Sequence, residues 1–528
     1  MRLKGIAILV AALVVAGGAA PASASAAQNS PAVVRTNTGL VRGEVGKDDR
    51  LFQGIPYAQP PTGALRWRPP QSARPWAGTY DATFPRSQCA QIAPVYGGET
   101  TYTEDCLYLN VTTPNRHLQG RHGLPVMVWA HGGSNVTGTG SAYNASKLAV
   151  RGGVIVVTIN YRLGPIGWLA HPALETGADR RYQAGNYGLL DQQAALRWVR
   201  RNIAAFGGDP RNVTLFGESA GAADSCANLV SPSAAGLFHK VIPESFSCAA
   251  PTRTEAGAEA DGAKFADAVG CGGKASPAET AACLRVVPVK TLLETFQAKD
   301  MTAGPVAGGD RVLPLQPAQA IAQGRFNRVP VMHGNTLDEM RLFVSLTYPQ
   351  PITAAQYEGI VRSMYGANAD KVLARYPARN YPDPRIALST IETDFGTSLS
   401  TCLHQDAFQA LSRAGVPVYA YQFADRTAPP LVDVPGFDEG AEHATELTYL
   451  FPGLLGDLNA QQQQLSDAMV DYWTSFARNA HPTAANAPHW PRFHSSTDVL
   501  SFTPGPNGIH PTDTAAQSNC AFWKSLSS

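Results

Sequence analysis

The amino-acid sequence predicts an α/β protein built on a mostly parallel sheet that helices cover on both faces. Short apolar, strand-like runs alternate along the chain with helical stretches, which is the pattern of strand–helix–strand units. Between two of these runs, residues 189–206 have helical periodicity, with one apolar face at Leu196, Val199, Ile203 and Phe206. The strand-like runs are residues 126–130, 154–160, 213–216, 329–332 and 418–423.

Length and composition indicate the domain organisation. The chain has 528 residues, of which 44% are hydrophobic and 16% charged, so it can bury a large core. No low-complexity linker, composition change or internal repeat divides it. We therefore expect residues 27–528 to form a single domain with large insertions. The net charge of +1 and the lack of a dense Lys/Arg run argue against nucleic acid and anionic membranes as partners.

The N-terminus has the organisation of a cleaved secretory signal. Arg2 and Lys4 precede an unbroken apolar run over residues 6–16, and the small residues of 20–26 offer an Ala-x-Ala cleavage site. The apolar run is short for a membrane span, and no later segment is long and apolar enough for one. We expect residues 1–26 to be removed and the mature protein to be secreted without a stable membrane anchor.

An exported protein meets an oxidising compartment, so its eight cysteines are expected to form disulfides. Two pairs are close in the sequence and would each close a local loop: Cys89 with Cys106, and Cys271 with Cys283. Spacing alone leaves the pairing open. No cysteine pair has the close spacing with histidine that a zinc site requires, so no metal site is predicted.

The N-terminal part of the mature chain carries two further local signals. Residues 33–42 alternate in polarity and contain turn residues, which predicts a β-hairpin. Residues 52–67 are too rich in proline and glycine for a helix or a central strand. We expect an ordered loop there.

The sequence of residues 213–221 predicts a strand, a sharp turn and a helix. Gly217 and Gly221 flank Ser219 at two residues on each side, where larger side chains would collide in a turn that exposes the hydroxyl. Such a turn places Ser219 at the carboxyl edge of the sheet and at a helix N-terminus, where N–H groups stabilise negative charge. Ser219 is the candidate nucleophile. The alternative is a glycine-rich turn with a bystander serine, because this pentapeptide pattern also occurs by chance.

A second glycine-rich loop follows the strand-like run 126–130. Residues 129–135 read Trp-Ala-His-Gly-Gly-Ser-Asn, and their glycines let a backbone with exposed N–H groups pass close to a ligand. Acyl transfer needs such donors, because its tetrahedral intermediate carries charge on the former carbonyl oxygen. Gly133, Ser134 and Ala220 are the candidate oxyanion donors; an ordinary glycine turn is the alternative.

A serine nucleophile needs a histidine base, and the histidine needs an acid to orient it. In α/β-hydrolases these residues follow the order serine, acid, histidine along the chain. Glu339 lies just beyond the strand-like run 329–332, and the adjacent Asp338 competes for the role of acid. His443 is the candidate base. Each residue alone could be an ordinary polar side chain, but their order after Ser219 favours a catalytic set.

Two longer segments add a family resemblance. Residues 206–221 read Phe-Gly-Gly-Asp-Pro-Arg-Asn-Val-Thr-Leu-Phe-Gly-Glu-Ser-Ala-Gly, and residues 104–110 read Glu-Asp-Cys-Leu-Tyr-Leu-Asn. They resemble the two signatures of the type-B carboxylesterase/lipase family, which includes the cholinesterases. The similarity covers nearly all of the mature chain, and it implies an α/β-hydrolase fold. It also extends through the segments of Glu339 and His443 and through residues 52–70, 160–164, 188–192 and 472–478.

The resemblance implies roles for individual residues. Ser219 matches the family's nucleophile, Glu339 its acid and His443 its base. Three disulfides are also implied: Cys89–Cys106, Cys271–Cys283 and Cys402–Cys520. Cys226 and Cys248 are left as an additional pair or as two thiols. Two buried ion pairs that hold loops are also implied: Arg66 with Glu104, and Arg162 with Asp191.

The chain departs from the family pattern in three places. Ser134 stands where the family usually has a third glycine; the backbone N–H remains, but a side chain now sits at the oxyanion loop. Residues 241–247 replace a pattern nearer Gln-Ser-Gly-Ser. The Cys89–Cys106 loop contains no tryptophan, whereas cholinesterases carry there the aromatic ring that holds a quaternary ammonium. The sequence therefore argues against choline esters as substrates.

These residues predict a secreted, cofactor-free serine carboxylesterase that acts on small-molecule esters. His443 would take the Ser219 proton, Ser219 would attack the ester carbonyl, and water activated by His443 would release the acid from the acyl-enzyme. Two alternatives are a non-catalytic, cholinesterase-like adhesion or binding protein and an amide or β-lactam hydrolase with the same triad. The intact Ser219, Glu339 and His443 favour catalysis over the first alternative.

Overall fold

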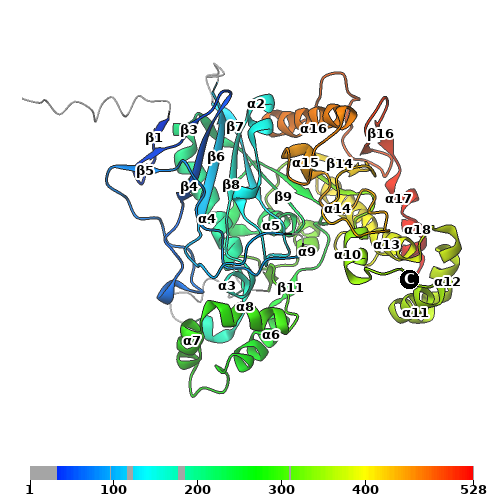
Figure 1. Ribbon diagram of the computed structural model, residues 1–528, viewed down its shortest axis with the longest axis horizontal. Coiled ribbons are helices and arrows are strands. Elements are labelled where there is room, and N and C mark those ends of the chain that lie inside the picture. The colour runs from blue at the N-terminus through cyan, green and yellow to red at the C-terminus, as the bar shows by residue number, and fades with distance from the viewer. Residues whose placement is uncertain (1–31, 96, 116–122, 176–184, 309–310, 527–528) are drawn as a thin grey trace, which may run out of the picture.

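Helices cover both faces of one large sheet at the centre of the molecule (Figure 1). The computed structural model describes residues 32–95, 97–115, 123–175, 185–308 and 311–526. The expected signal peptide, residues 1–26, lies outside the described residues. The α/β class predicted from the sequence is confirmed.

In the described part of the chain, eleven strands form the central sheet, which is parallel in its middle and antiparallel at both ends. The five runs expected as strands correspond to β7, β8, β9, β13 and β14, although β13 begins only at Val331 and β8 spans Ile155–Ile159. The strand order across the sheet is β16 (Ile509–Thr512), β15 (Val499–Phe502), β14 (Val418–Phe423), β13 (Val331–Thr336), β10 (Lys240–Glu244), β9 (Gly208–Glu218), β7 (Leu124–Ala130), β8 (Ile155–Ile159), β6 (Tyr108–Pro114), β4 (Asp49–Pro56) and β3 (Glu44–Val45).

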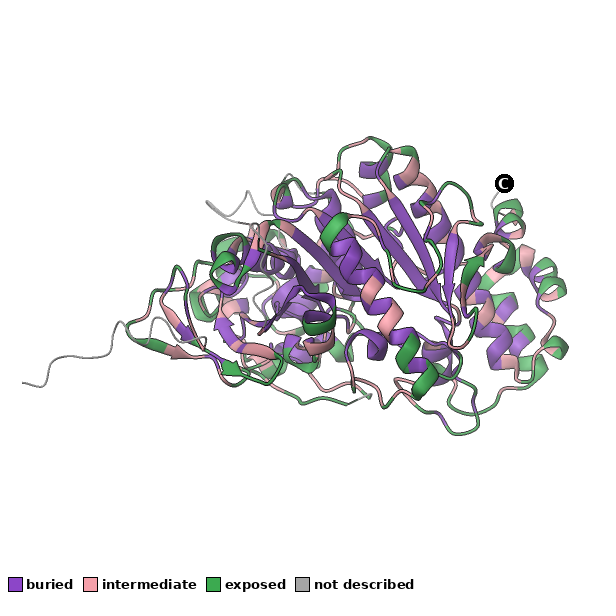
Figure 2. Ribbon diagram, turned by 90° about the horizontal axis from the view of Figure 1, so that it is seen from above, coloured by how far each residue is buried: buried purple, intermediate pink, exposed green. Residues whose placement is uncertain are grey.

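Side chains of the central strands alternate between two apolar cores. On β7, Val126 and Val128 belong to one core, and Met127 and Trp129 belong to the other. Both faces of the sheet are therefore buried, and Figure 2 shows buried strands between helices whose outer sides are exposed. The first face is covered by α4 (Tyr187–Asn202), α5 (Ala220–Val230), α9 (Pro317–Ala322) and α14 (Thr401–Arg413), and the second by α2 (Ser146–Gly152), α15 (Leu447–Leu450) and α16 (Ala460–Asn479).

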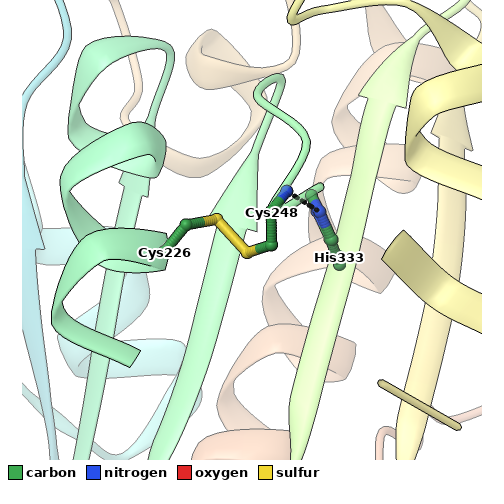
Figure 3. A group of neighbouring side chains, drawn as sticks. All are labelled: Cys226, Cys248 and His333. Atoms are coloured by element: carbon green, nitrogen blue, oxygen red, sulfur yellow. Dashed lines mark hydrogen bonds between the residues drawn. A yellow bond between two sulfur atoms is a disulfide. The ribbon is translucent and has the colours of Figure 1, made fainter. Parts of the chain in front are cut away.

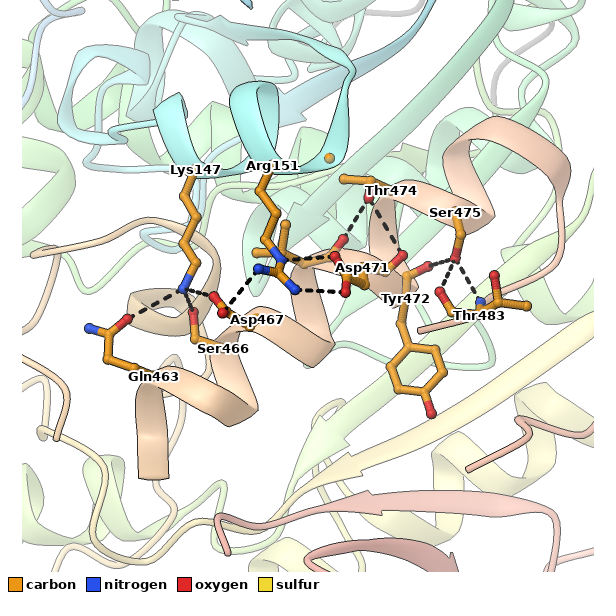
Figure 4. Close-up of polar contacts among 12 residues, drawn as sticks. Lys147, Arg151, Gln463, Ser466, Asp467, Asp471, Tyr472, Thr474, Ser475 and Thr483 are labelled. Carbon is orange, nitrogen blue, oxygen red and sulfur yellow. Dashed lines mark hydrogen bonds and ion pairs between the residues drawn. The ribbon is translucent and has the colours of Figure 1, made fainter. Parts of the chain in front are cut away.

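Polar contacts join α2 to α16 in the second helix layer (Figure 4). The Arg151 guanidinium donates to Asp471 at 2.8 Å and pairs with Asp467 at 3.0 Å, while Lys147 lies 2.8 Å from Asp467. Ion pairs that reach solvent contribute little stability, about 0–1 kcal/mol each. The network therefore mainly fixes how α2 lies on α16.

Two groups of helices extend this layered core and have apolar cores of their own. In Figure 1 the first group lies below the sheet and the second lies beside the C-terminal strands. The first consists of α3 (Gly164–Trp168), α6 (Glu255–Ala268), α7 (Pro277–Val286) and α8 (Val289–Ala298). The second consists of α10 (Arg341–Thr347), α11 (Ala354–Tyr365), α12 (Ala369–Arg375), α13 (Pro384–Asp394), α17 (Thr514–Gln517) and α18 (Cys520–Leu526).

Two further local predictions are confirmed, a hairpin near the N-terminus and a helix before β9. β1 (Val33–Arg35) and β2 (Leu40–Arg42) form the expected antiparallel hairpin, and β5 (Thr79–Asp81) pairs with β2. The helix expected over residues 189–206 is α4, which continues as a 3₁₀ turn over Ile203–Phe206.

The expectation of a loop throughout residues 52–67 is wrong for its first part. Residues 52–56 belong to β4, which pairs antiparallel with β6. Gly54 has φ +68° and lies where the register of this pairing shifts, between Phe52 and Ile55, and the pairing resumes beyond it up to Pro56, the last residue of the strand. Beyond β4 the chain is irregular as expected, apart from a 3₁₀ turn at Gly63–Leu65.

The two ion pairs implied by the family resemblance are present. Arg66 Nε lies 2.6 Å from Glu104 Oε1, and Arg162 Nε lies 2.7 Å from Asp191 Oδ2. Both members of the second pair are buried, and it ties the segment after β8 to α4. Breaking a buried pair would leave an uncompensated charge, so these contacts hold the loops around the carboxyl edge of the sheet.

The eight cysteines form four disulfides, Cys89–Cys106, Cys226–Cys248, Cys271–Cys283 and Cys402–Cys520. Cys226 and Cys248, whose state the sequence left open, are thus bonded to each other. Disulfides of this number indicate folding in an oxidising compartment. None of the helices in the described ranges has the length and apolar content needed to cross a bilayer.

Candidate active site

Ser219 forms a strained turn between β9 and α5. Its backbone has φ +55° and ψ −121°, a conformation that residues other than glycine adopt only when their surroundings hold them there. The two flanking glycines are sterically required, because a Cβ would lie 2.5 Å from Ala130 O at Gly217 and 2.0 Å from it at Gly221. The Ser219 N–H donates to Glu244 O on the neighbouring strand at 2.9 Å. The side chain remains partly exposed at the carboxyl edge of the sheet.

The glycine-rich loop after β7 lies against Ser219. A Cβ added to Gly132 would come within 3.1 Å of Ser219 Cβ. The next residues have positive φ, +98° at Gly133 and +54° at Ser134. The backbone N–H groups of Gly133, Ser134 and Ala220 have no acceptor among the described residues. They are therefore free to bind an oxygen anion beside the serine.

Buried contacts keep this loop in place. The Tyr161 hydroxyl donates to His131 O at 2.6 Å, and the Gly164 N–H donates to Asn135 O at 2.7 Å. The Asn135 amide in turn donates to Asp224 of α5 at 3.2 Å. The loop and the helix that follows Ser219 are thus connected directly, which fixes the free N–H groups relative to the nucleophile turn.

His443 and Glu339 meet in the interior. His443 Nδ1 lies 2.6 Å from Glu339 Oε2, and the other carboxylate oxygen accepts the Thr336 N–H at 2.8 Å. Burial lowers the pKa of His443, but the charge and hydrogen bond of Glu339 outweigh it and raise the pKa above its ordinary value. Because the carboxylate accepts from Nδ1, Nε2 is the nitrogen that can take up a proton.

Asp338 does not contact the imidazole. Its carboxylate lies 2.8 Å from Arg426 Nε and 3.2 Å from Arg341, both as ion pairs. It also accepts the Ala441 N–H at 3.0 Å, and the Asp338 N–H donates to Ala441 O at 3.0 Å. Asp338 therefore fastens the segment that carries His443, whereas the adjacent Glu339 reaches the ring.

Three further buried carboxyl groups surround this pair, and the sequence analysis missed them. Glu218 Oε1 lies 3.0 Å from His443 Nε2, Glu244 accepts the Trp473 Nε1–H at 2.9 Å, and Glu446 accepts from a serine hydroxyl. Burial and mutual repulsion raise the pKa of Glu218 and Glu446, and burial raises that of Glu244 to about 8. The sequence contained one signal for such a buried carboxyl group, because Glu244 ends the otherwise apolar run 241–244.

His443 Nε2 faces Glu218 in this structure, and the Ser219 hydroxyl has no hydrogen bond to a described residue. Catalytic hydrogen bonds to a serine often form only when substrate is bound. Glu218 immediately precedes Ser219 in the chain, so the imidazole lies beside the serine turn. A neutral Glu218 can donate its hydrogen to Nε2, whereas an ionised Glu218 can only accept a hydrogen from the charged imidazole.

A strained serine turn at the carboxyl edge of a mostly parallel sheet, free N–H groups beside it and a buried histidine–carboxylate pair define a serine hydrolase of the α/β-hydrolase class. The model of the carboxylesterase family matches residues 30–523, so the chain belongs to that family. It is therefore a carboxylic ester hydrolase.

Relatives of known function agree with this assignment. The chain is 34% identical to fumonisin B1 esterase of Sphingopyxis macrogoltabida, over 92% of this chain and 89% of that protein. It is also 34% identical to para-nitrobenzyl esterase of Bacillus subtilis (strain 168), over 88% of this chain and 93% of that one. A solved structure of a thermophilic para-nitrobenzyl esterase superposes with a TM-score of 0.77 at 31% identity, covering 93% of this chain and 100% of that chain.

Proposed function

We propose that this protein hydrolyses carboxylic esters through an acyl-enzyme on Ser219, with His443 as general base and Glu339 as the acid that orients it. The observation that carries the proposal is the buried 2.6 Å contact between His443 and Glu339 next to the strained Ser219 turn. A serine hydroxyl is a weak nucleophile by itself, and a base with an orienting acid is the arrangement that activates it.

In the first half of the reaction, His443 Nε2 takes the proton of Ser219 while the oxygen attacks the ester carbonyl. The carbonyl oxygen becomes negatively charged and accepts hydrogen bonds from the N–H groups of Gly133, Ser134 and Ala220. His443 then donates the proton to the departing alcohol, which leaves an acyl group on Ser219. In the second half, His443 takes a proton from water while the water oxygen attacks the acyl carbon. The bond to Ser219 then breaks, His443 returns the proton to the Ser219 oxygen, and the carboxylic acid is released.

We infer that the substrates are small-molecule carboxylic esters other than choline esters. The two esterase relatives are named for fumonisin B1 and for a para-nitrobenzyl ester, which supports a family scaffold that accepts unlike ester groups. Export of the protein is supported by its four disulfides, and removal of residues 1–26 would leave one domain over residues 27–528. No cofactor or metal takes part in the proposed steps.

The family and its esterase relatives favour this function over the two alternatives, a binding protein and an amide or β-lactam hydrolase. The test is labelling with a fluorophosphonate together with hydrolysis of a chain-length series of p-nitrophenyl esters. We expect covalent labelling of Ser219, and a loss of about 10³-fold or more in turnover for a folded Ser219→Ala variant. Turnover near that of the wild type in this variant would remove the proposed nucleophile.

A further inference from the structure

The Cys226–Cys248 disulfide joins α5 to the segment that follows β10 (Figure 3). Cys226 lies on α5, the helix that begins immediately after Ser219, and Cys248 lies just beyond β10. Their Cα atoms are 5.2 Å apart, and both side chains are fully buried. The bond therefore fixes the helix that carries the nucleophile to the end of the neighbouring strand.

His333 extends this connection to the strand that leads to the catalytic acid. The Cys248 N–H donates to His333 Nε2 at 3.3 Å, and His333 Nδ1 donates to Pro243 O at 2.8 Å. Burial lowers the pKa of His333, and neighbouring His404 lowers it further. The ring is thus neutral, with the proton on Nδ1, and both of its nitrogens are used to hold backbone.

The two ends of this path meet the proposed catalytic residues. On one side, the Ser219 N–H donates to Glu244 O of β10 at 2.9 Å. On the other, His333 lies on β13, whose last residue, Thr336, donates its N–H to Glu339 at 2.8 Å. A path of covalent and hydrogen bonds thus runs from the nucleophile helix to the orienting acid through the disulfide and His333.

We propose that the Cys226–Cys248 disulfide and His333 together are positioning groups for ester hydrolysis, which hold Ser219 in register with His443 and Glu339. Ser219 needs such support, because its backbone is strained and relaxes unless its surroundings oppose it. A displacement of about 1 Å at a nucleophile can lower turnover by about 100-fold while the binding surface stays intact. The expected consequence of losing the positioning groups is a lower kcat at nearly constant KM.

His333 and the two sulfur atoms also lie close enough together to suggest a metal site. In the oxidised protein, however, the sulfurs are bonded to each other, and His333 Nε2 accepts the Cys248 N–H. The cluster is therefore occupied by structural bonds, in agreement with a positioning role.

The test compares the double variant Cys226→Ala/Cys248→Ala with a matched control, Cys402→Ala/Cys520→Ala. The control removes a disulfide that joins α14 to α18 and spans 118 residues, against 22 for Cys226–Cys248, so its removal should destabilise the protein at least as much. Both are assayed below their unfolding temperatures, with active sites counted by fluorophosphonate. We expect kcat per active site to fall about tenfold or more in the first variant, with KM within about twofold, and to stay near that of the wild type in the control.

A second pair of variants covers the case in which the first double variant does not fold. His333→Gln can accept from Cys248 and donate to Pro243, whereas His333→Leu can do neither, so kcat should be largely retained in the first and lost in the second. Equal kcat in both His333 variants, or a kcat loss that is the same in both cysteine variants, would overturn the proposal.

The inference rests on Ser219 as the proposed nucleophile, and the two ideas can fail separately. An active Ser219→Ala variant would remove the nucleophile assignment. An inactive Ser219→Ala variant with an unchanged kcat in Cys226→Ala/Cys248→Ala would remove only the positioning role.

Discussion

His443 Nδ1 lies 2.6 Å from Glu339 Oε2, while the carboxylate of the preceding residue, Asp338, lies 2.8 Å from Arg426 Nε. Two adjacent carboxylates thus serve different purposes. One orients the proposed base, and the other holds the backbone near the base through Ala441. Substitution of each carboxylate by its amide should therefore affect ester hydrolysis very differently at the two positions.

Glu339→Gln should lower kcat by about 10³-fold or more, because the amide neither selects the productive tautomer nor stabilises the imidazolium that forms during catalysis. Asp338→Asn should keep kcat within about tenfold, since its carboxylate does not touch the ring. It should still lower stability by about 3 kcal/mol, because it breaks a buried ion pair. Steady-state kinetics and chemical denaturation of both variants measure the two effects, and the reverse ranking in kcat would make Asp338 the acid.

The pH dependence of ester hydrolysis follows from the raised pKa of His443. Only the neutral imidazole can take the Ser219 proton, so activity disappears as the pH falls through that pKa. Glu339 raises the pKa above the ordinary value of 6.5, so the acid limb of kcat/KM should have its midpoint above pH 6.5. Initial rates between about pH 5 and pH 9 locate it, and a midpoint below 6.5 would contradict the assignment.

The buried carboxyl of Glu244 should make stability depend on pH. Burial raises its pKa from 4.5 to about 8, so between these values the folded protein binds a proton that the unfolded chain has lost. Stability therefore falls as the pH rises through this window. Glu244→Gln removes the titration and can still accept from Trp473. The variant should match the wild type near pH 4.5 and gain stability as the pH rises, by up to about 3 kcal/mol at pH 7.

Chemical denaturation of both proteins at about pH 5 and pH 8 measures this difference. The neighbouring groups Glu218, Glu446 and Tyr421 are present in both proteins, so the difference between the two reports on Glu244 together with its effect on the pKa of these neighbours. A stability difference that does not change with pH would mean that Glu244 is not buried as a neutral acid.

The strained turn at Ser219 could be predicted from the sequence because its requirements are local. The steric limits at Gly217 and Gly221 are set by neighbours in the same turn and by the adjacent strand. The spacing of glycines around Ser219 is therefore enough to predict the turn. The strands also follow from local patterns, because apolar side chains are needed on both faces of a covered sheet.

The remaining features depend on contacts between distant parts of the chain. Residues alone could not choose between Glu339 and Asp338, because the choice rests on Arg426, 88 positions from Asp338. The strand at residues 52–56 becomes possible only through pairing with β6, and the raised pKa of Glu244 comes from its burial in the folded protein, where Trp473 of α16 donates to it. Such features require the tertiary structure because their partners come from separate elements.

Ser134 is a non-glycine residue with φ +54° in the loop proposed to supply oxyanion donors. Its proposed role is carried by the backbone N–H, which Ser134→Gly retains. The variant should keep kcat within about threefold for short esters, because a lost oxyanion donor would instead cost about 10²-fold or more. It should also hydrolyse bulky esters faster, because an exposed side chain beside Ser219 is removed. Ratios of kcat/KM for short and bulky p-nitrophenyl esters measure this, and a uniform loss of about 100-fold would show that the Ser134 hydroxyl itself acts in the reaction.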